Sequence, residues 1–344
     1  MSSTTATKSG AGKTVLITGG SGYVAAEVLN AFLSRGYNVR TTVRSEASAE
    51  KINKSHSKYI DQLSFVIVKD LQTPGGFDEA VKGVDGVIHT ASPFFLQVEN
   101  NERDLIKPAI NGTLEVLKSV QKNNPDVKRV VITSSFASIV DIFQGGRPGY
   151  TYTEKDWNPT TYEMAASQET PGAISYCAAK TFAEKAAFDF VKENKPNFDI
   201  TTICPPMIYG PGATDLKHLN TSAADIYRLI NGSEKTVPET NFFSFADVRD
   251  VGEVHARAYE SLEAAGQRYL CASSGYTYQQ VADIIRKDFP EKRDLCPEGT
   301  PNAPYPDVYK VDNSKVKKDL GMEFRPLQTT IHDMVAQFIA IEKA

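Results

Sequence analysis

A tyrosine and a lysine four residues apart are the first side chains in this sequence whose types and spacing suggest chemistry. Tyr176 and Lys180 belong to the segment S-Y-C-A-A-K, in which a helix places both on one face. Because an ammonium group favours a nearby phenolate, we expect Lys180 to lower the pKa of Tyr176 from its usual value of about 10. A phenol tuned in this way is suited to donate a proton to a carbonyl oxygen as a hydride arrives.

Two serines about forty residues earlier could complete this set. Ser134 and Ser135 follow the predicted strand 128–133, and ligands of open α/β sheets bind outside the carboxyl ends of the strands. There Ser135 could polarise the carbonyl, while Lys180 could also hold a nicotinamide ribose. Each signal is weak by itself, since tyrosine–lysine pairs occur by chance and strand-end serines often cap turns. These signals become stronger because the serines and then the tyrosine–lysine pair follow a phosphate-binding loop in this order along the chain.

That phosphate loop is a glycine-rich turn near the N-terminus. The run T-G-G-S-G-Y-V-A at 18–25 follows the apolar strand 14–18 and opens a helix. Glycines there permit positive φ and a close approach of the backbone to a pyrophosphate, and the helix N-terminus supplies N–H groups and a favourable dipole. A plain tight turn is the alternative, but the strand–loop–helix context favours a dinucleotide site.

The end of the second predicted strand indicates which dinucleotide binds. Strand 38–43 is followed by Arg44 and Ser45, with no acid before Glu46. An acid at this point would bind the adenosine ribose of NAD, whereas Arg44 could pair with the 2′-phosphate of NADP. The sequence therefore favours NADPH, with a solvated surface arginine as the alternative. Asp70, after the third strand, could reach the adenine amino group or cap the next helix.

Alternating strands and helices must position these residues. Strands are predicted at 14–18, 38–43, 63–68, 86–90, 128–133 and 200–204, and helices at 24–34, 102–122 and 175–194. Pro108 lacks an amide donor, so we expect a kink or a fresh helix start there. Continuous apolar strands separated by helices predict an α/β fold with a parallel sheet covered on both faces.

The chain divides into three predicted parts. Residues 1–12 are small and polar and predict a disordered tail, 13–204 form the dinucleotide-binding domain, and 205–344 mainly form a smaller second domain. Such chains can return segments to the first sheet. Helices are predicted in the last part at 221–231, 248–262, 277–288 and 327–343. The pattern lapses between Phe136 and Ala173, where a long functional or mobile loop is expected.

Composition excludes several classes of function. A net charge of -4 without a basic stripe gives nucleic-acid binding little support, and no apolar run reaches the length of a membrane span. The N-terminus lacks the features of a secretory signal or a transit peptide. The four cysteines have no paired spacing, so neither a disulfide framework nor a zinc site is suggested. A cytoplasmic location is the expectation.

Together these residues resemble the extended short-chain dehydrogenase/reductase superfamily. Within it the chain resembles the fungal aldehyde/ketone reductases that include methylglyoxal reductases and, more distantly, the plant dihydroflavonol reductases. The resemblance runs from Thr14 to about Ile341. Its longer motifs are H-T-A-S-P-F at 89–94, E-R-D-L at 102–105, P-A-I-N-G-T at 108–113, F-A-E-K-A-A at 182–187, Y-G-P at 209–211, H-L-N-T-S at 218–222 and D-V-R-D-V at 247–251.

The resemblance implies a Rossmann-type doubly wound parallel sheet with a smaller C-terminal α/β substrate domain. It implies Tyr176 as proton donor, Lys180 as its partner and Ser135 as carbonyl polariser. The implied cofactor site comprises Gly19, Gly20, Ser21, Gly22, Tyr23, Val24, Arg44, Asp70, Leu71, Thr90, Ala91, Ser92, Tyr176, Lys180, Ile208 and Ser222, and the implied substrate pocket comprises Phe94, Phe136 and Met207. Ser48 lies near the position where the family often has a second basic residue, so binding of the 2′-phosphate would depend more on Arg44 alone. Asn111 would support a proton-relay water or have a structural role.

The leading hypothesis is an NADPH-dependent carbonyl reductase that converts small aldehydes and ketones to alcohols, as a monomer or a homodimer. A nucleotide-sugar epimerase or dehydratase uses the same catalytic set but keeps NAD tightly bound, and the acid-free end of the second strand argues against it. A non-catalytic NADP-binding sensor is a third reading, although such proteins typically lose the tyrosine–lysine pair that this chain retains.

Overall fold

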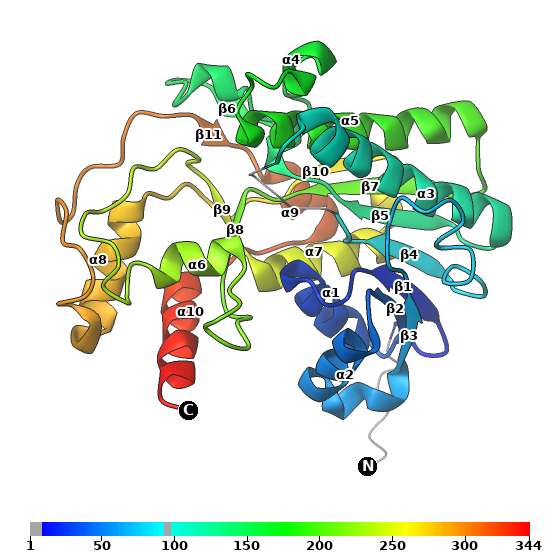
Figure 1. The fold of residues 1–344 in the computed structure, drawn as a ribbon, viewed down its shortest axis with the longest axis horizontal. Coiled ribbons are helices and arrows are strands. Elements are labelled where there is room, and N and C mark those ends of the chain that lie inside the picture. The colour runs from blue at the N-terminus through cyan, green and yellow to red at the C-terminus, as the bar shows by residue number, and fades with distance from the viewer. Residues whose placement is uncertain (1–8, 93–97) are drawn as a thin grey trace.

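A parallel sheet of seven strands forms the centre of the computed structural model, which describes residues 9–92 and 98–344 (Figure 1). The strand order is β10-β7-β5-β4-β1-β2-β3, and every neighbouring pair is parallel. The strands are β1 (Thr14–Thr18), β2 (Asn38–Val43), β3 (Leu63–Ile67), β4 (Gly86–His89), β5 (Arg129–Thr133), β7 (Asp199–Cys204) and β10 (Arg268–Leu270). The order reverses between β1 and β4, which is where such sheets bind ligands.

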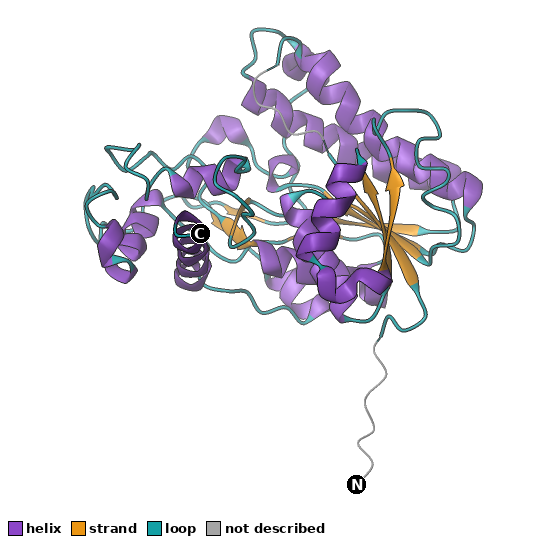
Figure 2. Ribbon diagram, turned by 60° about the horizontal axis from the view of Figure 1, so that its bottom comes forward, coloured by secondary structure: helices purple, strands orange, loops and turns teal. Residues whose placement is uncertain are grey.

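Helices cover both faces of this sheet, as Figure 2 shows. On one face lie α1 (Tyr23–Ser34), α2 (Glu46–Ser55) and α7 (Val248–Glu260); on the other lie α3 (Lys107–Asn123) and α5 (Gly172–Asn194). α1 illustrates why the sequence folds this way, because Val28, Leu29 and Phe32 recur at helical spacing and are fully buried against the sheet. Burial on both faces explains why the central strands β1, β4 and β5 are apolar over most of their length.

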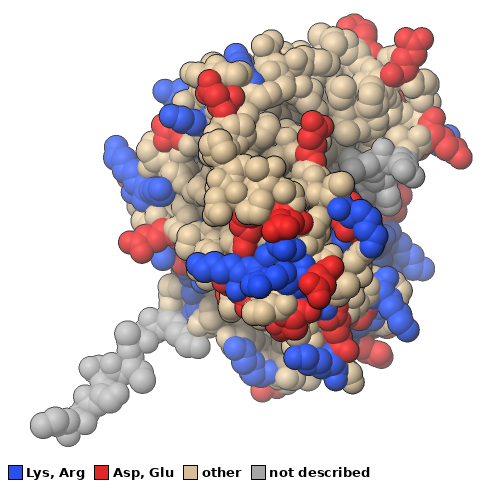
Figure 3. Space-filling view, turned by 90° about the vertical axis from the view of Figure 1, so that its left-hand side faces the viewer, with Lys and Arg blue, Asp and Glu red and all other residues tan. Residues whose placement is uncertain are grey.

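A second lobe packs around its own core. Its elements are β8 (Met207–Tyr209) paired with β9 (Phe245–Asp247), and helices α6 (Thr221–Tyr227), α8 (Tyr278–Asp288) and α10 (Leu327–Glu342). α9 (Ser314–Leu320) packs against α7 and β10 of the first lobe, the short strands β6 (Thr151–Tyr152) and β11 (Lys310–Val311) pair with each other, and α4 (Tyr162–Ala166) lies beside α5. On the face shown in Figure 3, acidic and basic side chains are interspersed. In the described ranges no helix is long and apolar enough to cross a membrane.

The predicted sheet is confirmed, and its strands end within one or two residues of their expected positions. The predicted helix 102–122 consists of a π-helical turn at Glu102–Ile106 followed by α3, with Pro108 in the first turn of α3. A proline is tolerated there because the first amides of a helix have no partner within it. The expected fresh helix start is therefore confirmed.

Several boundaries differ from the prediction. Of the predicted tail, residues 1–8 lie outside the described residues, while 9–12 form turns in which the Gly10 amide donates to the Arg35 carbonyl at 3.1 Å. The prediction of disorder is wrong for those four residues, because this hydrogen bond holds them to the end of α1. The predicted loop 136–173 contains β6 and α4. β10 comes from beyond residue 204 and completes the first sheet by pairing with β7.

Candidate active site

A crevice of about 830 Å³ opens at the carboxyl ends of the strands, where the strand order reverses. Its position is the one expected for a ligand of a doubly wound sheet. Nine of the predicted cofactor residues line it: Gly19, Ser21, Gly22, Arg44, Asp70, Leu71, Thr90, Ala91 and Ser92. These residues come from the loops after four different strands, so the fold brings together what the sequence keeps apart.

The loop between β1 and α1 fits a pyrophosphate. Gly19 has a φ of +71°, and a Cβ atom there would lie 2.9 Å from the Cβ of Ala91, so the loop holds its shape only with glycine. Gly22 is the N-cap of α1, and no side chain in the described part of the chain caps the first amides of that helix. Those N–H groups, with the positive end of the helix dipole, are suited to an anion in the crevice.

Three other predicted loop residues support the loop and are absent from the crevice lining. The Gly20 amide donates to the Thr42 carbonyl at 3.0 Å, and Val24 packs against the core. The Tyr23 hydroxyl donates to the carbonyl of Gly210 at 2.7 Å. Tyr23 therefore ties the phosphate loop to the segment that follows β8 in the second lobe.

Two cations follow adjacent strands at the far end of the crevice. Arg44 comes after β2 and Lys69 after β3, both line the crevice, and neither forms an ion pair within the described ranges. Sequence reasoning missed Lys69, although its signal was the same as that of Arg44: a basic residue at the end of a predicted strand. Ser48 is engaged locally, with its hydroxyl 3.1 Å from that of Ser45. Asp70 lines the crevice and accepts the amide of Gln72 at 2.9 Å, but turns rather than a helix follow it, so the alternative of a helix cap is wrong.

Tyr176 and Ser135 meet although they come from different elements. Tyr176 is half-buried in the first turns of α5, and its phenol is hydrogen-bonded to Ser135, whose Oγ also accepts the Ala137 amide at 3.1 Å. Burial raises the pKa of Tyr176 above its ordinary value, and the hydrogen bond from Ser135 lowers it only in part. The phenol therefore keeps its proton at neutral pH.

The expected effect of Lys180 on Tyr176 is wrong in this structure. The Nζ atom of Lys180 lies 5.8 Å from the centroid of the Tyr176 ring and donates to Ser92 Oγ at 2.8 Å. The pKa of Tyr176 moves upward because desolvation outweighs its other influences. Burial lowers the pKa of Lys180 to about 8, against the opposing influence of Glu184. Lys180 thus links α5 to the crevice through Ser92.

The remaining predicted residues are dispersed. Ile208 lies on β8, Ser222 lies in the first turn of α6, and Met207 packs against the core of the second lobe. Phe136 is 1% exposed and packs against Tyr152 and Tyr309, with ring centroids 5.6 and 5.8 Å away. The ring fills core in this structure, and its predicted place in the substrate pocket stays a prediction.

Two further predictions concern residues outside this set. Phe94 lies outside the described residues, so its predicted place in the substrate pocket stays a prediction. Asn111 is exposed on α3, one turn after Pro108, which lines the crevice.

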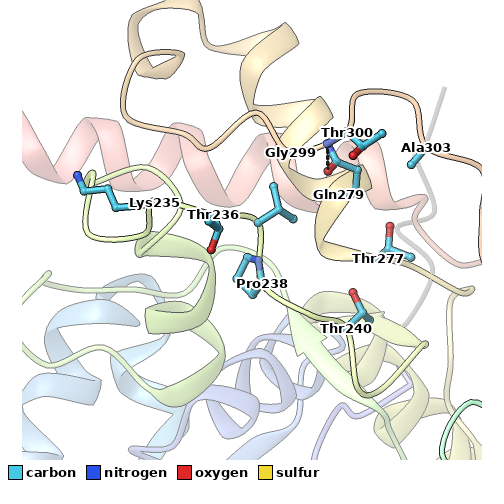
Figure 4. A pocket seen from close by; sticks show the side chains of 10 residues that line it. Lys235, Thr236, Pro238, Thr240, Thr277, Gln279, Gly299, Thr300 and Ala303 are labelled. Carbon is cyan, nitrogen blue, oxygen red and sulfur yellow. Dashed lines mark hydrogen bonds between the residues drawn. The ribbon is translucent and has the colours of Figure 1, made fainter.

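A second hollow, of about 440 Å³, lies in the second lobe near the start of α8 (Figure 4). Thr236, Thr240, Thr277 and Thr300 contribute hydroxyls to it, and Lys235 is its one charged side chain. The backbone amide of Thr300 is already taken by the side chain of Gln279, at 2.9 Å. No residue of this hollow lines the crevice, so the groups suited to chemistry gather at the sheet.

Comparison with known proteins gives one family and several similar chains. Residues 15–272 match the model of the NAD dependent epimerase/dehydratase family. The chain is 39% identical to the ketoreductase azaE of Aspergillus niger and 35% identical to an NADPH-dependent methylglyoxal reductase of Saccharomyces cerevisiae, each time over 95% of this chain and 98% of the relative. It superimposes with a TM-score of 0.90 on the crystal structure of yeast methylglyoxal/isovaleraldehyde reductase Gre2 complexed with NADPH. That match is 34% identical and covers 96% of this chain and 99% of the other.

Proposed function

The chain belongs to the NAD dependent epimerase/dehydratase family, and within that family we propose that it is an NADPH-dependent reductase of small aldehydes and ketones. The observation that carries the proposal is the half-buried phenol of Tyr176, which keeps its proton and is hydrogen-bonded to Ser135. A proton donor held by a second hydroxyl is what reduction of a carbonyl requires. Full-length similarity to a methylglyoxal reductase and a ketoreductase supports the same reaction.

The residues of the site divide the work of this reaction. Bound NADPH supplies a hydride to the carbonyl carbon. Tyr176 gives its phenolic proton to the carbonyl oxygen, so the product is the alcohol and the tyrosine is left as phenolate. Ser135 holds the same oxygen by a hydrogen bond and increases the positive charge on the carbon. Lys180, whose Nζ donates to Ser92 Oγ at 2.8 Å in the crevice, would hold the nicotinamide ribose, and the phenolate takes up a proton from solvent before the next turnover.

Arg44 and Lys69 support the choice of NADPH over NADH. Both side chains line the crevice from neighbouring strand ends, and no acid in the described part of the chain neutralises either of them. A 2′-phosphate between two cations gains charge-assisted hydrogen bonds that a ribose hydroxyl cannot match. We infer that Lys69 takes over the role of the second basic residue, for which this chain has Ser48.

Replacing either cation is expected to weaken binding of the 2′-phosphate selectively. In Arg44→Met and Lys69→Met, affinity for 2′,5′-ADP is expected to fall about tenfold each, because one charge-assisted hydrogen bond is lost. Affinity for 5′-AMP, which lacks the 2′-phosphate, is expected to stay within twofold. Isothermal titration calorimetry measures both. Lys54→Met on the exposed side of α2 is the control and is expected to change neither. If the ratio of the affinities for 2′,5′-ADP and 5′-AMP is unchanged in Lys69→Met, Lys69 does not bind the 2′-phosphate and Arg44 binds it alone.

The reductase activity itself is tested by mixing the purified protein with NADPH and a panel that contains methylglyoxal, aliphatic aldehydes and aryl ketones. Loss of nicotinamide absorbance and formation of the alcohol are expected with part of the panel. A protein that binds NADPH but reduces nothing in a broad panel contradicts the proposal and favours the sensor. An absorbance spectrum that shows tightly bound NAD in the purified protein favours the epimerase or dehydratase. The cytoplasmic location and the monomeric or homodimeric state stay predictions of the sequence.

A further inference from the structure

A buried ion pair lies one helical turn beyond Lys180 and is not used in the reaction described above. Glu184 on α5 is 2% exposed, and its Oε1 lies 2.8 Å from the Nε of Arg268, the first residue of β10. Four attractive contacts from Arg268, Ser138 and Thr202 hold the pKa of Glu184 below its ordinary value even though burial acts in the opposite direction. A buried charge of this kind is costly unless its partners satisfy it, so those partners show what it holds in place.

The partners of Glu184 lie on both sides of Ser135. Ser134 Oγ donates to Glu184 Oε2 at 2.7 Å, and Ser138 Oγ donates to the same oxygen at 2.6 Å. Ser138 closes a turn with Ser135, because the Ser138 amide donates to the Ser135 carbonyl at 3.0 Å. A single oxygen of the Glu184 carboxylate therefore binds both Ser134, which precedes Ser135, and Ser138, which ends the turn that follows Ser135.

Ser135 has little freedom under this grip. Its backbone is extended, with φ of -160° and ψ of 153°. The Ser134 amide donates to the Ile203 carbonyl at 2.7 Å and the Phe136 amide donates to the Pro205 carbonyl at 2.9 Å, so the backbone on either side follows β7. With the backbone fixed by β7 and the neighbouring side chains fixed by Glu184, the hydroxyl of Ser135 is aimed at the phenol of Tyr176.

Arg268 extends the same cluster into the loop above it. Its NH1 donates to the carbonyls of Glu154 and Asp156 at 2.6 and 2.9 Å, and its guanidinium lies 3.5 Å from the centroid of the Trp157 ring. The Asn158 amide then donates to the Ser138 carbonyl at 2.9 Å. The loop is thus closed back onto the turn that contains Ser135.

We propose that Glu184 is a positioning residue, whose carboxylate fixes the Ser135 hydroxyl against Tyr176 by holding Ser134 and Ser138. Arg268 balances the charge of that carboxylate. The inference rests on the proposed function insofar as it predicts an effect on turnover. A displacement of about 1 Å of a group that contacts the substrate is enough to reduce a rate about 100-fold. Loss of the hydrogen bonds that hold Ser134 and Ser138 is therefore expected to affect kcat more than the binding of NADPH.

Direct replacement of Glu184 is a poor test, because a buried and uncompensated Arg268 would be strongly destabilising. The Ser134→Ala/Ser138→Ala double variant keeps the Glu184–Arg268 ion pair and removes the two hydroxyls that hold the turn of Ser135, together with the hydrogen bond from Arg268 NH2 to Ser138 Oγ at 3.3 Å. Thr202→Val is the matched control. Thr202 Oγ1 donates to the other oxygen of the same carboxylate at 2.5 Å, but from β7 and without contact to the turn of Ser135. The double variant removes two hydrogen bonds to Glu184 and the control removes one, so a merely structural role predicts a loss of kcat in both variants that follows the loss of Tm.

The expected results separate the two roles. In the serine double variant kcat is expected to fall 10- to 100-fold, with the Kd of NADPH within twofold of the wild type. In Thr202→Val kcat is expected to stay within twofold, although its Tm falls. Equal losses of kcat in the two variants, or a kcat within twofold in the double variant, would overturn the proposal.

A second measurement does not depend on turnover. With tyrosines labelled by ¹³C at Cζ, the resonance of Tyr176 is assigned by its absence in Tyr176→Phe. This resonance is expected to move in the serine double variant as it does in Ser135→Ala, and to stay in place in Thr202→Val. An unmoved resonance in the double variant overturns the positioning role. If the wild type reduces no carbonyl but the resonance moves as expected, the proposed function fails while the positioning role stands.

Discussion

Tyr176→Phe is expected to lower kcat by about 10²- to 10⁴-fold and to leave NADPH binding within twofold of the wild type. The range is the usual contribution of a positioned general acid. Phenylalanine keeps the half-buried aromatic ring at this position of α5, so the variant removes the phenolic proton and the hydrogen bond to Ser135 and little else. Steady-state kinetics with the best carbonyl of the panel and quenching of protein fluorescence by NADPH measure the two quantities.

Tyr162→Phe is the control for the loss of a phenol. Tyr162 is 39% exposed on α4, and its hydroxyl donates to Glu102 at 2.9 Å, away from Ser135. Its kcat is expected to equal that of the wild type. Near-normal turnover in Tyr176→Phe would take Tyr176 out of the mechanism and direct attention to another proton donor.

Gly19→Ala is expected to raise the Kd of NADPH at least 100-fold. The added methyl group would lie 2.9 Å from the Cβ of Ala91, closer than real Cβ atoms approach, in a backbone conformation with φ of +71°. The strand-to-helix loop must then move, and the amides at the start of α1 lose their alignment with the pyrophosphate. Calorimetric titration with NADPH measures the loss.

Gly83→Ala separates backbone strain from steric conflict. Gly83 has a φ of +64°, and a Cβ atom there would meet nothing within 4 Å. Both variants share the cost of a left-handed alanine, about 1–2 kcal/mol of stability. Only Gly19→Ala is expected to lose cofactor affinity. An unchanged Kd in Gly19→Ala would mean that the loop accommodates a side chain and that its glycine is not required for the cofactor.

The parts of the fold that were predictable are those in which local pattern and burial agree. The expected ends of β1 and β2 agree with the observed ones, because most residues of both strands are buried and turn residues bound them. Pro108 marked the start of α3 for a local steric reason. The family resemblance is confirmed by the match over residues 15–272. The residues of the phosphate loop are consecutive in the sequence, so the conformation of this loop could also be predicted from its own glycines.

The rest depended on contacts between distant segments. The direction of the Tyr176 pKa follows from how much protein surrounds the phenol, and spacing on a helix does not report burial. Lys180 was expected beside the phenol because both share a helix face, whereas its ammonium reaches Ser92 on another loop. Glu184 belongs to the sequence motif at 182–187, but its role cannot be predicted from that motif, because the role depends on the ion pair that the fold creates with Arg268. Phe136 is a comparable case, since an aromatic residue after a strand suits a pocket and a core equally well.

The place of β10 at the edge of the sheet also determines the order in which this protein can mature. β10 pairs with β7 and carries Arg268, yet residues 205–267 separate the two strands along the chain. On the ribosome, β7 therefore emerges well before its neighbour, with an open edge and with Glu184 lacking its cation. Such non-local pairings form slowly, and unpaired edges invite association with other chains. The nucleotide loop is among the first parts to be synthesised, whereas Ser135 reaches its final setting only after the chain has been made past Leu270.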